Sequence, residues 1–234
     1  MQAVRAVFFD AGNTLVFADL ERTLAPLYAR GVAPTHDQLY GAERTARRVR
    51  DQAAAAGNTR LHDEDYWIIY YRELLQVLRL DDAELVAALV QEARRSANWQ
   101  RVQPGTRDAL LALRSGGLRV GLISNSDGRI AELMERVGLG GCFDSITDSG
   151  TIGIEKPAPG IFLAALQAVG VTASESVYVG DIYSIDYVGA RAAGMQALLF
   201  DVSGTYEGTE LPRVESLTEL LHLMSPFIRR GAAT

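Results

Sequence analysis

The chain has 234 residues, of which 48% are hydrophobic and 22% charged, and its formal net charge is -6. This composition is typical of a globular protein, and the length favours one core plus an insertion. The mildly acidic balance argues against nucleic acid or an anionic membrane as the main partner. No apolar run approaches the ~20 residues that a membrane span needs, and no signal-like segment precedes the first strand. With Cys142 as the only cysteine, we expect a cytoplasmic protein that is not associated with a membrane.

The first predicted element is a buried strand that ends in a carboxylate. Residues 7–9 are Val-Phe-Phe, and Asp10 follows them directly. The pair Gly12-Asn13 indicates a tight turn. Because open α/β sheets bind ligands at the carboxyl ends of their strands, Asp10 is a candidate site residue. Taken alone, it is equally an aspartate that caps a loop.

Residues 17–99 are predicted to form an all-helical insertion. Apolar residues recur at helical spacing in four segments, 20–30, 35–57, 62–80 and 82–96. Thr35 and either Asp81 or Asp82 are the expected N-caps of the second and fourth segments. The predicted domains are therefore a core of residues 1–16 and 100–234 and a helical domain of residues 17–99.

Strands and helices alternate after Pro104-Gly105. Strands are expected at 119–124, 143–147, 176–179 and 196–200, with helices at 106–114, 128–137, 159–169, 184–193 and 216–224. This alternation predicts an α/β fold with a doubly wound, mostly parallel sheet. Residues 204–212 and 229–234 are expected to be loop and tail.

Polar residues stand at four places where the parallel sheet would present its carboxyl edge. They are Asp10, the pair Ser124-Asn125, Lys156 just before a helix, and Asp181 with Asp186 beyond it. Because these strand ends meet at one edge, the side chains should converge. Carboxylates provide the oxygen ligands that Mg²⁺ prefers, and a hydroxyl and an ammonium can bind a phosphoryl group. A carboxylate can also attack phosphorus and form an aspartyl-phosphate.

Lys156 is the only lysine among the 23 lysine and arginine residues of the chain. Codon bias explains a general excess of arginine. Such a bias replaces lysine wherever arginine serves equally well. The retention of Lys156 therefore suggests a site that needs a compact ammonium group.

This ordered set resembles the haloacid dehalogenase superfamily of phosphohydrolases that use an aspartate nucleophile. The family pattern is Asp-x-Asp-x-Thr, then Ser or Thr, then Lys, then Gly-Asp-x-x-x-x-Asp. The corresponding positions here are Asp10-Ala11-Gly12-Asn13-Thr14, Ser124, Lys156 and residues 180–186. The resemblance implies a Rossmann-like core, with residues 17–99 as the family's helical cap.

The resemblance also implies a function and a set of site residues. The function is that of a Mg²⁺-dependent phosphatase, which hydrolyses a small phosphorylated metabolite through an aspartyl-phosphate on Asp10. The implied catalytic residues are Asp10, Ser124 and Lys156, and the phosphate-binding residues are Ser124, Asn125, Lys156 and Thr14. The implied metal ligands are Asp10, the carbonyl group of Gly12, Asp181 and, as a ligand or a neighbour of one, Asp186.

Gly12 departs from the family pattern, because the family has there an aspartate that protonates the leaving group and then activates water. Such acid–base help is worth about 10²–10⁴-fold in rate. Two alternatives therefore stay open. A metal-independent 2-haloacid dehalogenase would share Asp10-Ala11 and Thr14-Leu15, although Gly180-Asp181 favours a metal site. A regulatory protein that binds phosphate but turns over little would explain Gly12.

Two groups of residues in the predicted cap have alternative interpretations. We interpret a basic run as a solvated helix face, and contact with an anionic substrate is the alternative; its members are Arg44, Arg47, Arg48 and Arg50. We expect an aromatic group to form the core of the cap; its members are Tyr66, Trp67, Tyr70 and Tyr71.

Overall fold

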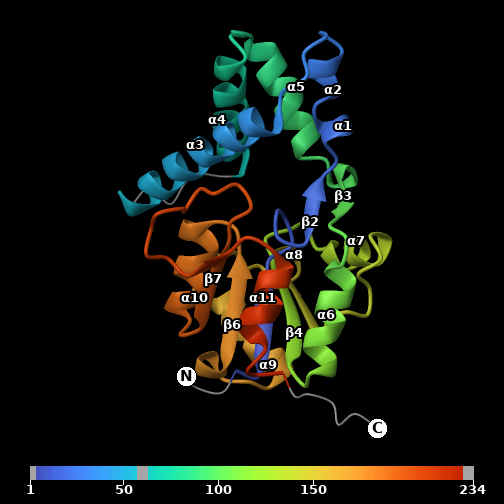
Figure 1. Ribbon diagram of the computed structural model, residues 1–234, viewed down its shortest axis with the longest axis vertical. Coiled ribbons are helices and arrows are strands. Elements are labelled where there is room, and N and C mark those ends of the chain that lie inside the picture. The colour runs from blue at the N-terminus through green and yellow to red at the C-terminus, as the bar shows by residue number, and fades with distance from the viewer. Residues whose placement is uncertain (1–3, 57–62, 229–234) are drawn as a thin grey trace. The chain divides into compact units, whose positions relative to one another are not determined.

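The computed structural model in Figure 1 describes residues 4–56 and 63–228. The chain divides into two units. The core unit consists of Met1–Phe17, Arg101–Asp201 and Glu210–Thr234, and the helical unit consists of Ala18–Gln100 and Val202–Thr209.

In the described part of the core unit, six parallel strands form one sheet in the order β5-β4-β1-β6-β7-β8. The strands are β1 (Ala6–Phe9), β4 (Arg119–Ser124), β5 (Ser145–Asp148), β6 (Ser176–Gly180), β7 (Gln196–Phe200) and β8 (Arg213–Val214). The chain extends the sheet from β1 to β4 and β5, then returns to place β6 on the other side of β1. This reversal makes the carboxyl ends of β1 and β6 a topological switch point, where ligands of such sheets bind. The α/β fold predicted from the sequence is confirmed.

Helices pack against the sheet because each strand alternates its side chains between two faces. The helices of the core unit are α6 (Thr106–Ser115), α7 (Ile130–Arg136), α8 (Ser149–Ile152), α9 (Pro159–Val169), α10 (Val188–Ala192) and α11 (Leu217–Met224). The short helical turns η2 (Ala173–Glu175) and η3 (Tyr183–Tyr187) flank β6, and η3 is π-helical. On one face, Phe8 and Tyr178 pack with Phe162 of α9 in a buried cluster. This packing makes the ends of β1 and β6 a rigid platform for the residues that follow them.

The helical unit has a core of its own. Its helices are α1 (Leu20–Thr23), α2 (Ala25–Tyr28), α3 (His36–Ala55), α4 (Asp63–Val77), α5 (Ala83–Ala93) and the turn η1 (Ser96–Asn98). Thr35 and Gln38 form a reciprocal capping box at the start of α3, and Asp82 caps α5. The helix predicted over 20–30 is two short helices, because a new helix starts at Ala25 with Pro26 in its first turn.

A two-stranded sheet that the sequence pattern did not predict joins the two ends of the insertion. It pairs β2 (Val16–Ala18) with β3 (Trp99–Val102). Both strands are only three or four residues long, so their period-two pattern is too short to detect from sequence.

The basic run of α3 is only partly a solvated face. Arg48 is exposed, whereas Arg47 and Arg50 are 2% and 5% exposed. Arg47 forms an ion pair with Glu43, and the guanidinium of Arg50 lies 5.5 Å from the ring centre of Tyr66. The interpretation of a solvated face is therefore wrong for Arg47 and Arg50. The aromatic residues expected to form a helical core lie in the core of the helical unit, with Trp67 partly buried and the three tyrosines buried.

The segment Val202–Thr209 lies between β7 and β8 in the sequence but packs with α3. The Nη1 atom of Arg44 donates to the carbonyl oxygen of Ser203 at 2.8 Å, and the hydroxyl of Tyr206 donates to Asp51 at 3.0 Å. The helical unit is thus assembled from two separate stretches of sequence.

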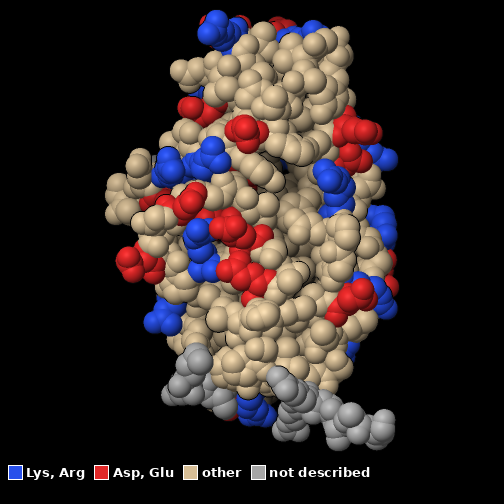
Figure 2. All heavy atoms as spheres, viewed as in Figure 1, with Lys and Arg blue, Asp and Glu red and all other residues tan. Residues whose placement is uncertain are grey.

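Acidic and basic side chains lie interspersed on the face of the molecule shown in Figure 2. That face therefore lacks an extended patch of one charge sign. Among the described residues, no helix combines the length and the apolar character that crossing a membrane would require.

Candidate active site

Three buried carboxylates meet at the switch point of the sheet. Asp10 follows β1, Asp181 follows β6, and Asp186 lies in η3; their exposed fractions are 8%, 2% and 1%. One oxygen from each lies within 4.8 Å of the others. The adjacent parallel strands β1 and β6 explain this convergence, and the main chain of Asp10 is fixed by a hydrogen bond from its N–H to the carbonyl oxygen of Val179 at 2.8 Å.

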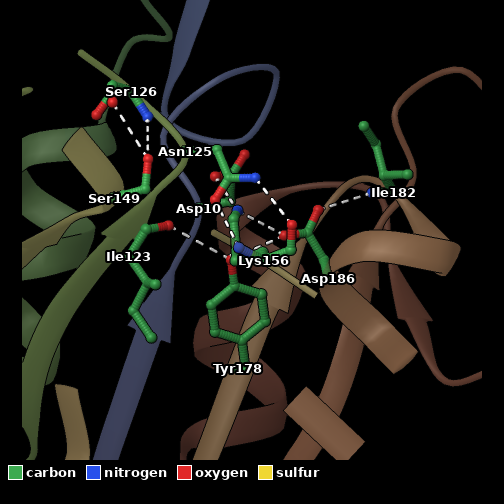
Figure 3. Close-up of polar contacts among 9 residues, drawn as sticks. All are labelled: Asp10, Ile123, Asn125, Ser126, Ser149, Lys156, Tyr178, Ile182 and Asp186. Carbon is green, nitrogen blue, oxygen red and sulfur yellow. Dashed lines mark hydrogen bonds and ion pairs between the residues drawn. The ribbon is translucent and has the colours of Figure 1, made fainter. Parts of the chain in front are cut away.

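Lys156 places its ammonium group between two of these carboxylates, as Figure 3 shows. Its Nζ atom donates to Oδ1 of Asp10 at 2.5 Å and to Oδ1 of Asp186 at 2.7 Å. A third hydrogen bond, 2.9 Å long, runs from Nζ to the hydroxyl oxygen of Tyr178. The side chain of Lys156 is 3% exposed, so all three contacts lie in a region shielded from water.

Burial and charge perturb the pKa values of this cluster. Burial raises the pKa of Asp10 to about 6, against the opposing effect of the Lys156 charge. Burial by itself would lower the pKa of Lys156, but the charges of Asp10 and Asp186 outweigh it and raise that pKa above its ordinary value. Lys156 is therefore a permanent cation at neutral pH.

The loop after β4 is fixed to the segment that carries Lys156. The side chain of Asn125 accepts from the backbone N–H of Lys156 at 2.7 Å and donates to the carbonyl oxygen of Lys156 at 3.0 Å. Ser124 is the last residue of β4 and is 5% exposed. The structure thus brings Asn125 to Lys156 and leaves Ser124 at the carboxyl edge of the sheet.

The loop after Asp10 is a tight turn closed by backbone hydrogen bonds. The N–H of Val16 donates to the carbonyl oxygen of Ala11 at 2.9 Å, and Asn13 has a φ of 51°. Gly12 and Val16 form an isolated β-bridge across this turn. Thr14 is 1% exposed, and its Oγ1 atom has no hydrogen-bond partner among the described residues. This buried hydroxyl is consistent with a residue that steadies the loop or faces a ligand.

Three further residues shape the site and were not predicted from the sequence. Tyr178 contacts Lys156 through its hydroxyl. It lies inside a Val-rich strand, where a single tyrosine indicates core packing and not a site residue. Asp148 accepts from the N–H groups of Gly128, Ile130 and Gly150 at 3.1, 3.1 and 2.9 Å. Ser149 accepts from the N–H of Ser126 at 3.0 Å. Asp148 follows the same rule as Asp10, a carboxylate at the end of a parallel strand, and that rule could have found it.

The donor set at this edge fits a divalent cation. Three carboxylates supply hard oxygen ligands. Gly180 keeps them close, because a Cβ atom on this residue would lie 2.5 Å from Cγ of Asp186. An aspartate at the switch point, a buried lysine beside it and further carboxylates define the class of haloacid dehalogenase-like hydrolases.

The chain belongs to the haloacid dehalogenase-like hydrolase family, because the family model matches residues 4–194. Haloacid dehalogenase-like hydrolase domain-containing protein 3 of Xenopus laevis is 33% identical over 143 residues, which are 59% of this chain and 58% of that protein. The match thus spans little more than half the length of this relative.

Two further comparisons extend over more of the chain. A glyceraldehyde 3-phosphate phosphatase of Methanothermobacter thermautotrophicus is 29% identical over 205 residues, 84% of this chain and 85% of that protein. A HAD phosphatase from Thermococcus onnurineus has the same fold, with a TM-score of 0.60, 24% identity and coverage of 94% of this chain and 98% of its own. Structures of dehalogenases share this fold as well.

Proposed function

We propose that this chain is a Mg²⁺-dependent phosphatase that hydrolyses a phosphomonoester of a small metabolite through an aspartyl-phosphate on Asp10. The observation that carries the proposal is the contact of Asp10 with the buried ammonium of Lys156, beside two further carboxylates. The similarity to a glyceraldehyde 3-phosphate phosphatase supports a small phosphorylated substrate.

Asp10 is the proposed nucleophile. Its carboxylate attacks phosphorus, the bond between phosphorus and the leaving oxygen breaks, and the leaving oxygen takes up a proton from solvent water. A second water then attacks the phosphorus of the acyl phosphate and releases a proton to solvent, the bond between phosphorus and the Asp10 oxygen breaks, and phosphate leaves. Lys156 offsets the repulsion between the carboxylate and the incoming phosphate, because its charge lies 2.5 Å from Asp10.

The remaining residues have distinct proposed roles. Asp10, the carbonyl oxygen of Gly12 and Asp181 would hold the metal, and bound Mg²⁺ would supply positive charge beside the phosphoryl group. Asp186 instead positions Lys156, since its Oδ1 already accepts from Lys156 and its Oδ2 accepts from the N–H of Ile182 at 3.0 Å.

The phosphoryl group itself would be bound by side chains at the edge of the sheet. Ser124 would donate its hydroxyl to a phosphoryl oxygen, with Lys156 on the other side. Asn125 would act through the loop of Lys156, to which it is hydrogen bonded, and Thr14 would steady the turn that carries Gly12.

A metal-independent dehalogenase is the second candidate. It would use the same Asp10 to attack carbon and form an ester, and dehalogenase structures share the fold. Asp181 favours the phosphatase, because it adds a buried negative charge near Asp10 beyond that of Asp186, and a bound Mg²⁺ would offset this charge.

The test is phosphate release from a panel of phosphomonoesters, with Mg²⁺ and with EDTA. The panel contains an activated aryl ester and several alkyl esters, and the proteins are wild type, Asp10→Asn and Asp108→Asn, an exposed aspartate of α6, as the matched control. We expect Mg²⁺-dependent release from wild type and the control and none from Asp10→Asn. No release from wild type, together with metal-independent halide release from 2-haloacids, would assign the dehalogenase instead. If neither phosphate nor halide is released but the chain still binds phosphate, the regulatory alternative is assigned.

A further inference from the structure

Three acceptors surround the ammonium of Lys156, one for each of its N–H bonds. Two are the carboxylates of Asp10 and Asp186, and the third is the hydroxyl of Tyr178 at 2.9 Å. Figure 3 shows the ring of Tyr178 approaching Lys156 from the interior of the sheet. The hydroxyl therefore completes the hydrogen bonding of the ammonium from the side opposite the open edge.

Packing by itself does not explain a tyrosine at this position. Tyr178 is 0% exposed, and its ring packs edge-on against Phe162 with a centroid distance of 5.1 Å. A phenylalanine would make the same ring contact. A buried hydroxyl costs free energy unless it is hydrogen bonded, so its presence indicates a polar function.

The hydroxyl of Tyr178 links three parts of the site. It accepts from Lys156 and donates to Oδ1 of Asp186 at 2.9 Å; the carbonyl oxygen of Ile123, the residue before Ser124, lies at 3.5 Å. Asp186 is thus engaged by both the lysine and the phenol. The two carboxylates already set the rotation of the ammonium about its last side-chain bond. The phenol, as the third acceptor, occupies the remaining N–H and holds the Nζ atom in place.

We propose that Tyr178 is a positioning residue that acts through Lys156: its hydroxyl keeps one N–H of the ammonium directed at the nucleophile Asp10. The consequence for the reaction rests on the function proposed above. The orientation of Lys156 itself does not depend on the substrate. The two statements can therefore be tested separately.

The first experiment compares the kinetics of Tyr178→Phe with those of wild type. The matched control is Tyr187→Phe, which alters a partly buried tyrosine of η3 stacked on Tyr183. Loss of one buried hydrogen bond to a charged group predicts a fall in kcat of roughly tenfold, with KM changed less than about twofold. Thermal unfolding of each variant is measured in parallel. An unchanged kcat in Tyr178→Phe, or a fall matched by Tyr187→Phe, would overturn the role in the reaction.

The second experiment needs no substrate, because Lys156 carries the only lysine amine of the chain. An amine-acylating reagent is applied below the unfolding temperature, and modification of Lys156 is followed by mass spectrometry after digestion at arginine. We expect labelling of Lys156 to be several-fold faster in Tyr178→Phe than in wild type or Tyr187→Phe. Equal rates would overturn the positioning of Lys156 by Tyr178. Faster labelling in a chain whose wild type releases no phosphate would reject the phosphatase and keep the positioning.

Discussion

The charge balance of individual residues at the switch point explains why the site should bind a cation. Asp10, Asp181 and Asp186 carry three negative charges when ionised, against the single positive charge of Lys156. Burial is the main cause of the raised pKa of Asp10, and the negative charge of Asp186 adds to it. A divalent cation would restore neutrality without protonating the nucleophile.

Activity should depend on pH through the ionisation of Asp10. Its pKa is raised to about 6, so the inactive protonated form persists to higher pH than for an ordinary aspartate. At limiting Mg²⁺, kcat/KM should therefore increase as pH rises through about 6. A bound cation favours the carboxylate, so saturating Mg²⁺ should move the midpoint to lower pH. The measurement is kcat/KM against pH at both metal concentrations, and identical midpoints would contradict the expectation.

Restoring a carboxyl group at Gly12 should change which substrates react well. Gly12→Asp places an acid where the family has one, so hydrolysis of alkyl esters should increase relative to the aryl ester, by up to about 10²-fold. Gly12→Ala is the control, since it adds Cβ without the acid. A similar substrate profile in both variants would show that the chain supplies its proton elsewhere.

At the scale of elements, the approach of η3 to the end of β6 fixes the position of Asp186. Gly180, the last residue of β6, permits this approach because it has no side chain. The buried strand cannot move away, since both of its neighbours in the sheet pair with it along its length.

Gly180→Ala should therefore displace Asp186 and loosen Lys156. The added Cβ would lie 2.5 Å from Cγ of Asp186. We expect a loss of activity of more than about tenfold and destabilisation of about 1–3 kcal/mol from overpacking. Steady-state kinetics and chemical denaturation measure the two effects. Gly41→Ala is the control, because its added Cβ would have only one neighbour, at 3.9 Å. Full activity in Gly180→Ala would show that η3 can shift away from the added Cβ without displacing Lys156.

Elements also determine how much of the site could be predicted from sequence. Asp10 and Asp181 were predictable because a parallel sheet collects the residues that end its strands. Tyr178 was not, because its function depends on a contact with Lys156, which lies 22 residues away. The strand β8 was missed because it has only two residues, and its pairing with β7 is a tertiary effect.

At the scale of the whole molecule, metal binding should stabilise the fold. A ligand that binds only the folded state adds about 2.7 kcal/mol at one hundred times its dissociation constant. Increasing Mg²⁺ should thus raise the Tm of wild type and of Asp108→Asn, and Asp181→Asn should abolish most of the increase. Thermal unfolding at several Mg²⁺ concentrations measures this. A Tm that rises equally in Asp181→Asn would place the cation elsewhere.

The helical unit has a discontinuous origin, because Val202–Thr209 contributes to it from the connection between β7 and β8. Tyr206 is 5% exposed and bonded to Asp51, and Ser203 is bonded to Arg44. If residues 18–100 were replaced by the corresponding helical segment of a relative, Val202–Thr209 of this chain would no longer match the helices against which it packs. A chimera should be viable only when both stretches are transferred together, and the two stretches should vary together among homologues.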